Sequence, residues 1–286
     1  MVYCESMINL SEWMSHRNPV LVMGIVNVTP DSFYDGGRFV RPEDAIERGL
    51  RMADEGADII DVGGESTRPG ARPIAVREEI GRVLPVVEGL RARSPVHVSI
   101  DTTKAQVAEE AVSLGAAIIN DVTALRSDER MSEVAARTGA FVVLMHMRGS
   151  PETMQQSPSY SDVVEQIGVF LNERIHAAVD AGIARGKILV DPGIGFGKTV
   201  EHNLAILRNL QRLTGLGPPI LVGVSRKSFL GAILDLPSDE RSEATIAANT
   251  AAILNGASII RVHDAKEGRR TADIAVRLRS DVPASR

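Results

Sequence analysis

Several features that mark particular protein classes are scarce in this sequence of 286 residues. It has a single cysteine, Cys4, so it can form neither an internal disulfide nor a thiolate metal cage, which agrees with a reducing cytoplasm. Aromatic residues make up only 3% of the chain, so a large core must be filled mainly by Ile, Val, Leu and Ala. Acidic residues outnumber basic ones by 37 to 32, and the basic excess typical of nucleic-acid binding is therefore missing.

Long apolar runs are missing as well. The first 18 residues mix Glu5, Glu12, His16 and Arg17 with apolar residues, and no stretch approaches the roughly 18 uninterrupted apolar residues of a membrane span. We therefore expect a cytoplasmic protein with neither a membrane nor a nucleic acid as partner. Hydrophobic residues at 44% and charged residues at 24% are ordinary for a globular domain, which argues against a disordered or fibrous chain.

Short runs rich in β-branched residues alternate with longer segments of helical periodicity. Eight such runs lie at 22–27, 58–62, 97–101, 117–120, 141–146, 188–191, 220–225 and 258–263, and most of them are apolar on both sides, as in buried parallel strands. Helices are expected between them, including segments 42–55, 75–91, 104–114, 161–181, 200–213 and 240–254. Glycine follows four of these segments, where a helix end commonly needs a left-handed residue, at Gly56, Gly115, Gly182 and Gly256.

Eight strand–helix units predict an α/β fold, a single (β/α)8 TIM barrel whose active site lies at the C-terminal strand ends. No proline-rich linker or charge block divides the chain. We assign residues 1–18 to an N-terminal lead-in, 19–282 to the barrel and 283–286 to a C-terminal tail. A doubly wound open sheet is the main structural alternative.

Polar residues recur where the predicted strands end. The set consists of Asn27, Asp61, Asp101, Asn120, Asp121, His146, Asp191, Ser225, Lys227, Arg261 and His263. Any one of them could simply mark the start of a polar loop. All eight strands share the pattern, however, and acids, carboxamides, cations and histidines outnumber ordinary loop residues, so we expect one pocket at the mouth of the barrel.

Three connecting segments should enlarge that mouth. Segment 29–37 combines proline, a double glycine and two carboxylates, and segment 63–70 carries Arg68 and two hydroxyls among glycines. Each could instead be a plain surface turn. Segment 191–199 is similar to a phosphate loop, but Gly193 and Gly197 are separated by three residues where a Walker motif needs four. We therefore expect it to bring backbone close to a flat ligand beside Phe196.

The polar set divides into two chemical groups. Asp101, Asn120, Asp191 and Lys227 offer acceptors and one cation at the barrel floor, which suits a 2-amino-4-oxo-pyrimidine edge that donates to a carboxylate and accepts from a lysine. An internal ion-pair network is the alternative. Nearer the rim we place a second group suited to an anion and to Mg²⁺, which comprises Asn27, Arg68, Arg261 and His263. Here the alternative is a surface ion pair between Arg261 and Asp264.

The chain also resembles the dihydropteroate synthase family of pterin-binding TIM barrels. The resemblance rests on eight motifs in the family's order: MGIVNVTPDSF at 23–33, DVGGESTRPG at 61–70, SIDT at 99–102, IND at 119–121, LMHM at 144–147, DPGIGFGKT at 191–199, SRKSF at 225–229 and IRVHD at 260–264. It implies a transferase of a pterinylmethyl group. Such an enzyme condenses 6-hydroxymethyl-7,8-dihydropterin diphosphate with 4-aminobenzoate, and forms 7,8-dihydropteroate and pyrophosphate in folate biosynthesis.

The resemblance also implies a role for individual residues. Catalytic roles fall to Asp35, Arg68 and Lys227. The pterin would contact Asp101, Asn120, Val122, Met145, Asp191, Phe196, Gly223 and Lys227. The diphosphate would contact Asn27, Thr67, Arg68, Arg261 and His263, with Mg²⁺ as cofactor held at Asn27. The 4-aminobenzoate site would comprise Thr67, Pro69, Phe196 and Ser228.

Two other functions stay open on the sequence alone. A pterin-binding methyltransferase module would bind the same heterocycle but would not need Arg68 or the anion-binding pair Arg261 and His263. A non-catalytic pterin-binding paralogue would not need Asp31, Asp35 and Arg68, which are present. The resemblance further implies a homodimer formed through helices late in the barrel, and sulfonamides as possible inhibitors.

Overall fold

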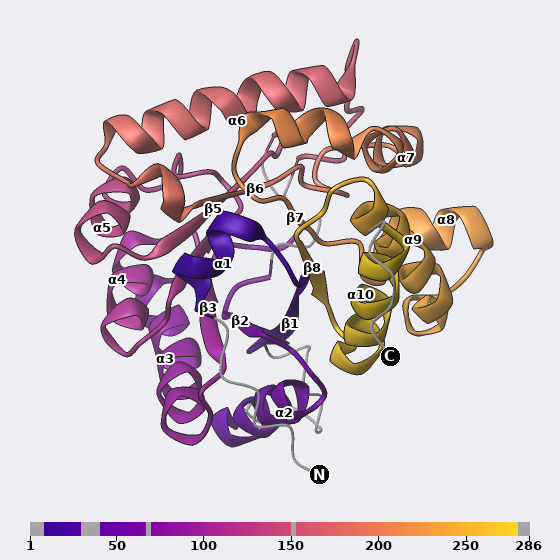
Figure 1. Cartoon of the computed structure of the whole chain (residues 1–286). Coiled ribbons are helices and arrows are strands. Elements are labelled where there is room, and N and C mark those ends of the chain that lie inside the picture. Colours follow the sequence, from indigo (N-terminus) through magenta and orange to yellow (C-terminus); the bar gives the residue numbers. More distant parts are fainter. Residues whose placement is uncertain (1–8, 30–40, 67–69, 150–152, 280–286) are drawn as a thin grey trace.

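A computed structural model of the chain describes residues 9–29, 41–66, 70–149 and 153–279. Eight strands alternate with helices around a central barrel (Figure 1). The strands are β1 (Leu21–Asn27), β2 (Ile59–Gly63), β3 (His97–Asp101), β4 (Ile118–Asp121), β5 (Phe141–Met145), β6 (Ile188–Asp191), β7 (Leu221–Val222) and β8 (Ile259–Val262). All eight predicted strands are therefore present, with β7 much shorter than expected.

Helices accompany the strands, and all of those described except α1 form the outer layer. The helices are α1 (Leu10–His16), α2 (Pro42–Asp54), α3 (Val76–Arg93), α4 (Ala105–Ser113), α5 (Met131–Thr138), α6 (Val163–Asp180), α7 (Val200–Arg208), α8 (Ser228–Leu234), α9 (Ser242–Leu254) and α10 (Ala265–Arg279). The expected helix at 200–213 is divided at Asn209 into α7 and a 3-10 segment, η2 (Leu210–Leu216). None of the described helices has both the length and the apolar character that crossing a membrane requires.

Every strand pairing in the sheet is parallel, in the order β6-β5-β4-β3-β2-β1-β8-β7. A parallel bridge between Val190 and Ile220 joins β6 to β7, and the amide of Val190 donates to the carbonyl of Pro219 at 3.0 Å. The two edge strands thus meet, and the sheet closes into the predicted (β/α)8 barrel rather than a doubly wound open sheet.

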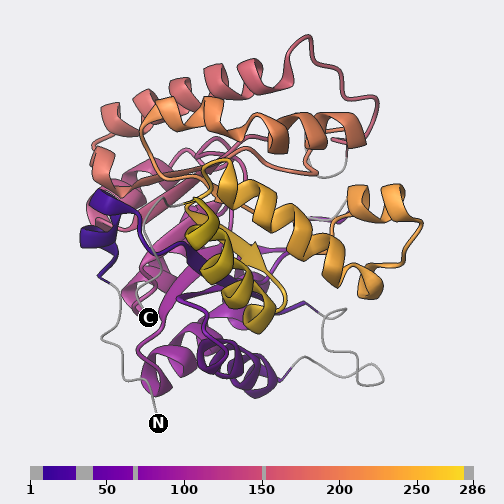
Figure 2. The same cartoon turned by 45° about the vertical axis from the view of Figure 1, so that its right-hand side comes forward.

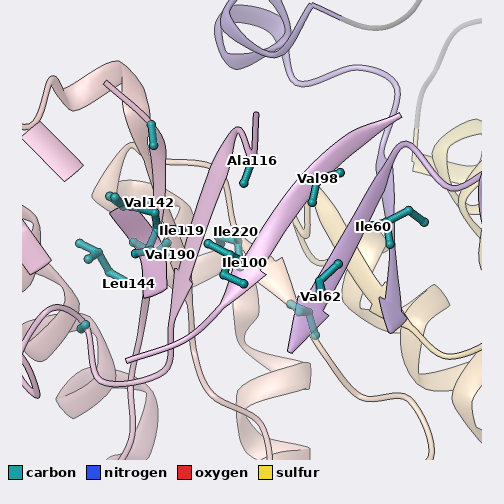
Figure 3. Close-up of a cluster of buried hydrophobic side chains, with 14 of the residues drawn as sticks. Ile60, Val62, Val98, Ile100, Ala116, Ile119, Val142, Leu144, Val190 and Ile220 are labelled. Carbon is teal, nitrogen blue, oxygen red and sulfur yellow. The ribbon is translucent and has the colours of Figure 1, made fainter. Parts of the chain in front are cut away.

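Side chains alternate between the two faces of the strands, as the period of two requires. Outward residues such as Ile60, Val98 and Val142 pack beneath the helices, and Figure 3 shows this layer across neighbouring strands. Inward residues near the strand starts form a second apolar cluster, comprising Leu21, Met23, Ile59, Ile118, Phe141, Val143, Leu189, Leu221 and Ile259. The strands are therefore buried on both faces, which explains their continuous apolar runs.

Helix α1 closes the amino-terminal end of the barrel. Its side chains Leu10 and Trp13 belong to the inner apolar cluster, and the Trp13 indole donates to the carbonyl of Pro19 at 2.7 Å. Asn9 caps the helix by accepting from the amides of Ser11 and Glu12. Figure 1 looks onto this end, with indigo α1 lying over the strands, and Figure 2 shows α1 at one side and the loop-rich end of the barrel at the other. The lead-in assigned to 1–18 thus includes a packed helix.

Helix ends follow the local chemistry expected of them. Asp162 begins α6 by accepting from the amides of Val164 and Glu165 at 2.9 and 3.0 Å. Thr199 begins α7 with a capping box that includes His202. The four glycines predicted at helix ends all have positive φ, between 94° and 108°.

Candidate active site

The polar floor arises from the alternation along each strand. Inward residues of the apolar cluster are followed two positions later by other inward residues, one layer nearer the mouth. Ile59 lies two positions before Asp61, and Ile118 lies two positions before Asn120. The same spacing on the later strands leads to Met145, Asp191, Gly223 and Arg261. The strand ends therefore place predicted site residues in one layer above an apolar plug.

One ion-pair network connects four strands across this layer. The Arg261 guanidinium donates through Nε to Oδ2 of Asp61 at 2.6 Å and through a terminal nitrogen to Oδ2 of Asp101 at 2.8 Å. Asn120 donates its side-chain amide to the same Asp61 oxygen at 3.0 Å. Oδ1 of Asp61 is buried and has no hydrogen-bond partner among the described residues. Burial raises the pKa of Asp101, while Arg261 opposes this shift and Asp61 adds to it.

This network corrects two expectations. Arg261 lies with Asp61 and Asp101 on the floor, not in a separate group nearer the rim. The alternative ion pair between Arg261 and Asp264 is wrong, because Asp264 instead binds Arg226 through contacts of 2.8 and 2.9 Å. The floor therefore contains a third carboxylate and a second cation beyond the set expected from the sequence.

A second cluster on the floor forms around β6 and β7. Oδ1 of Asp191 accepts from the amide of Gly193 at 2.6 Å, and Asp191 itself is 7% exposed. Burial raises the pKa of Asp191, and Lys227 acts against this rise. Lys227 donates to the carbonyl of Ile194, and its ammonium lies 4.8 Å from the centroid of the Phe196 ring. Burial lowers the pKa of Lys227 to about 8, although Asp191 counteracts it.

An absent side chain leaves room between the two clusters. A Cβ added to Gly223 would lie 3.7 Å from Cβ of Arg261 and 3.9 Å from Nζ of Lys227. Gly223 therefore brings bare backbone close to both cations.

An apolar wall stands beside these charges. Val122, Met145 and Phe196 pack in one cluster with Met147 and Met154. The structure thus brings together the three apolar residues predicted to contact a ring, from the ends of β4, β5 and β6. A flat ligand in this place would meet side chains on its face and charged groups at its edge.

The predicted anion group is partly described. A Cβ built on Gly63 would lie 3.4 Å from Cβ of Asp101 and 3.7 Å from Oδ1 of Asn27, so Asn27 lies next to the floor network. The His263 ring nitrogen Nδ1 is 3.0 Å from Oγ of Ser225. Burial, followed by Arg261, lowers the pKa of His263 to about 4, so the imidazole is neutral near pH 7. Ser228 is exposed at the first position of α8, whereas Asp31, Asp35, Thr67, Arg68 and Pro69 lie outside the described residues.

The turn that carries Lys227 is held by residues that the sequence analysis did not select. Arg226 has a left-handed backbone, with φ of 56°, and pairs with Asp264 after β8. Its amide donates to Thr245 and its carbonyl accepts from Arg241, both at 3.0 Å. Their partners lie 15, 19 and 38 positions away in the chain, so no local pattern in the sequence indicates these contacts.

The described residues contain no group of three or more His, Cys, Asp or Glu side chains that could hold a metal ion. A side-chain oxygen such as that of Asn27 can still serve as a single protein ligand, since Mg²⁺ commonly takes most of its ligands from phosphates and water.

The barrel and its floor define a class: a (β/α)8 enzyme with buried charges at the carboxyl ends of its strands. A family model described as pterin binding enzyme matches residues 23–263. The chain is 48% identical over 246 residues to dihydropteroate synthase of Escherichia coli K12, covering 86% of this chain and 87% of that protein. It is 46% identical over 259 residues to the Bacillus subtilis enzyme of the same name, covering 91% and 88%.

Solved structures agree. A Yersinia pestis dihydropteroate synthase in a sulfonamide drug complex has a TM-score of 0.88 and 44% identity, covering 96% of this chain and 97% of that one. A Xanthomonas albilineans dihydropteroate synthase in complex with 7,8-dihydropteroate has a TM-score of 0.84 and 41% identity, covering 93% and 96%. The chain belongs to the dihydropteroate synthase family. The predicted family, enzyme class and barrel fold are therefore confirmed.

Proposed function

We propose that this chain condenses 6-hydroxymethyl-7,8-dihydropterin diphosphate with 4-aminobenzoate, and releases pyrophosphate and 7,8-dihydropteroate. The observation that carries the proposal is the position of Asp191 and Lys227 on the barrel floor, an acid and a base with opposed pKa shifts beside an apolar wall. The relatives named above support the reaction, since one of them was solved with 7,8-dihydropteroate bound.

The floor has the chemistry to recognise a pterin edge. The Asp191 carboxylate would accept from the 2-amino group and a ring N–H, and the Lys227 ammonium would donate to the ring carbonyl. Asn120 and Asp101 offer further hydrogen bonds, while Val122, Met145 and Phe196 would lie against the ring. Buried charges of this kind are costly without partners, so the ligand would supply hydrogen-bond donors to these carboxylates.

The leaving group would be bound by the adjacent anion-binding residues. Arg261 and His263 would contact the diphosphate together with Asn27, Thr67 and Arg68, and Asn27 would contribute an oxygen to Mg²⁺. When bound, Mg²⁺ supplies positive charge that stabilises the departing pyrophosphate. Because Arg261 already pairs with Asp61 and Asp101, it would be fixed in orientation before the anion arrives. Asp35 and Arg68 would act catalytically by ordering the pyrophosphate.

The second substrate needs no protein nucleophile. Loss of pyrophosphate leaves positive charge on the methylene carbon, which the ring can share. The aniline nitrogen of 4-aminobenzoate then attacks this carbon and releases one of its protons to water. Thr67, Pro69, Phe196 and Ser228 would form the aminobenzoate site. Sulfonamides are proposed as inhibitors at this site, supported by the drug complex of the Yersinia pestis relative.

Pyrophosphate release tests the proposal. Purified protein with both substrates and Mg²⁺ should release pyrophosphate and form 7,8-dihydropteroate in equal amounts, and omission of 4-aminobenzoate should stop product formation and the sustained release of pyrophosphate. Pterin binding without product at any magnesium concentration or pH would favour the non-catalytic paralogue instead. Methyl transfer to a corrinoid would favour the methyltransferase module.

We further propose a cytoplasmic homodimer. An apolar groove between α7, α8 and α9 supports the dimer, since Leu204, Phe229 and Ala248 line it and Ile233 beside them is 49% exposed. Sedimentation should give twice the chain mass, and Ile233→Asp should give the mass of one chain. A wild-type protein that sediments as a monomer at micromolar concentration would contradict the proposal. The single cysteine supports the reducing location.

A further inference from the structure

Lys198 is a buried cation that the reaction described above does not use. It is 3% exposed and lies at the end of the segment that follows β6. Its ammonium is 3.0 Å from Nδ1 of His146, 3.3 Å from the carbonyl of His146 and 3.0 Å from the carbonyl of Phe196. An ammonium has three donors, so these three acceptors match its full capacity.

The acceptors belong to two different barrel units. His146 follows β5, whereas Phe196 follows β6 and contributes to the apolar wall of the site. Lys198 therefore ties the segment from Asp191 to Thr199 onto the end of the preceding strand. The same segment begins at Asp191, so it carries one residue of the floor and one residue of the apolar wall.

The two backbone segments lie directly against each other. A Cβ on Gly193 would come within 1.9 Å of the carbonyl oxygen of His146, and one on Gly197 within 2.5 Å of the carbonyl oxygen of Arg148. Both glycines also have positive φ, of 67° and 66°. The segment after β6 is thus seated on the segment after β5, with Lys198 as its charged contact.

The histidine is suited to accept a proton donor. Burial, followed by Lys198, lowers the pKa of His146 to about 3, so the ring is neutral. Its ring stands edge-on to Phe170, with centroids 5.0 Å apart and an interplanar angle of 87°. A neutral ring held in this way accepts at Nδ1 and carries its proton on Nε2. Burial lowers the pKa of Lys198 to about 7, while Asp191 opposes this shift and Lys227 adds to it.

We propose that Lys198 and His146 form a positioning pair that fixes the Asp191 carboxylate and the Phe196 ring in the geometry needed to bind the heterocycle. The inference rests on the proposed function only for the identity of that heterocycle, a pterin. Neither residue is assigned a chemical step. The pair acts through the segment that it holds, so its loss should weaken pterin binding more than it slows turnover.

Three variants test the pair. Lys198→Met removes the three donors and keeps the length of the side chain, His146→Leu removes the ring acceptor, and His146→Asn keeps an acceptor near the position of Nδ1. The dissociation constant of the pterin diphosphate, measured by calorimetry without aminobenzoate, should rise about tenfold in Lys198→Met and His146→Leu. His146→Asn should stay within about threefold of the wild type, and kcat at saturation should change little in all three.

The double variant provides a second measurement. Because the two residues act as one contact, their effects should not add. The variant that combines Lys198→Met with His146→Leu should bind the pterin diphosphate about as weakly as either single variant. The ¹⁵N shift of His146 Nδ1 should also move in Lys198→Met, which a general loss of packing would not cause. Lys187→Met is the matched control, since Lys187 precedes β6 at its other end and lies over the Phe141 ring at 3.8 Å.

The outcomes separate the two proposals. Normal pterin affinity in Lys198→Met would overturn the positioning pair and leave the proposed function intact. Equal losses in Lys198→Met and Lys187→Met would also overturn it. A wild-type protein that binds the pterin diphosphate but releases no pyrophosphate would overturn the proposed function alone, because the affinity measurements need no turnover.

Discussion

The two inward layers of the barrel are built on the same strands yet differ in almost every physical property. Near the strand starts, Leu21, Ile59 and Phe141 meet Trp13 of α1 in an apolar plug. Two positions further along the strands, the layer contains Asp61, Asp191 and Arg261. Burial raises the pKa of Asp191, and Arg261 forms an ion pair with Asp61 that ties β8 to β2. Two positions along a strand therefore separate a layer that stabilises the fold from a layer suited to bind a ligand.

The contrast follows from the effect of each layer on the free energy of folding. Burying apolar area contributes free energy at about 25 cal/mol per Å². Burying charges costs free energy unless partners are nearly ideal, and Oδ1 of Asp61 has no hydrogen-bond partner among the described residues. The plug should therefore account for stability and the floor for function, and the following experiments separate the two.

The largest effect should come from the plug. Trp13→Ala removes the largest side chain between α1 and the strands, together with its hydrogen bond to Pro19. We expect the free energy of unfolding to fall by about 3–5 kcal/mol in urea denaturation. The kcat of the folded fraction should not change. Trp13→Phe keeps an aromatic ring at this position and should lose less stability. A large drop in kcat for Trp13→Ala would contradict the division between a stabilising plug and a functional floor.

The floor should respond in the opposite way. Asp191→Asn replaces an acceptor by an amide that also donates, and opposes the donors of the ligand, so pterin affinity should fall by about 100-fold, or about 2–3 kcal/mol. Stability should be unchanged or higher, because a buried carboxylate with a raised pKa is removed. Calorimetry and urea denaturation measure the two quantities. Asp58→Asn makes the same chemical change at the other end of the barrel, and its pterin affinity should match that of the wild type.

A histidine at the mouth should make the fold sensitive to acid. The pKa of His146 is about 3 in the folded protein and 6.5 in its unperturbed state, so its contribution to stability is complete above pH 6.5 and is lost as the pH falls toward 3. Between pH 7 and pH 5, the stability advantage of the wild type over His146→Asn should shrink by about 2 kcal/mol. Parallel urea curves for the two proteins at both pH values measure this difference.

A carboxyl group at the plugged end should have the opposite and smaller effect. Asp58 accepts from the amide of Val22 and pairs with Arg269, and burial raises its pKa from 3.8 to about 6. Its protonation therefore stabilises the fold below pH 3.8, and this contribution is lost as the pH rises through 6. From pH 7 to pH 5 the wild type should gain about 1 kcal/mol relative to Asp58→Asn. If the wild type instead loses stability over that range, the pairing with Arg269 outweighs burial in setting the pKa of Asp58.

The sequence predicted the elements and most of the floor for clear reasons. Continuous apolar runs identify doubly buried strands, and Asp101, Asn120, Asp191 and Lys227 were expected together because parallel strands end at one edge. Family resemblance added Val122, Met145, Phe196 and Gly223, which the structure places around that floor.

Pairings between side chains were not predictable in the same way. Arg261 has Asp264 three positions away, yet it binds Asp61 and Asp101, which are 200 and 160 positions away. Lys198 and His146 are 52 positions apart and meet only because the segment after β6 folds back onto β5. Helix α1 was also missed, because it has only seven residues and precedes the first strand–helix unit. Such contacts depend on closure of the barrel, which local patterns do not encode.

The closure of the barrel has a consequence for how a ligand and the fold affect each other. Strands β6 and β7 join through the single bridge between Val190 and Ile220, and β7 has two residues. Asp191 and Lys227 stand on opposite sides of this seam. A heterocycle bound by both residues would link β6 to β7. Binding of this ligand should therefore slow amide hydrogen exchange on β6 and β7 more than on β2 and β3. The bound substrate would then connect the two strands whose junction closes the barrel around it.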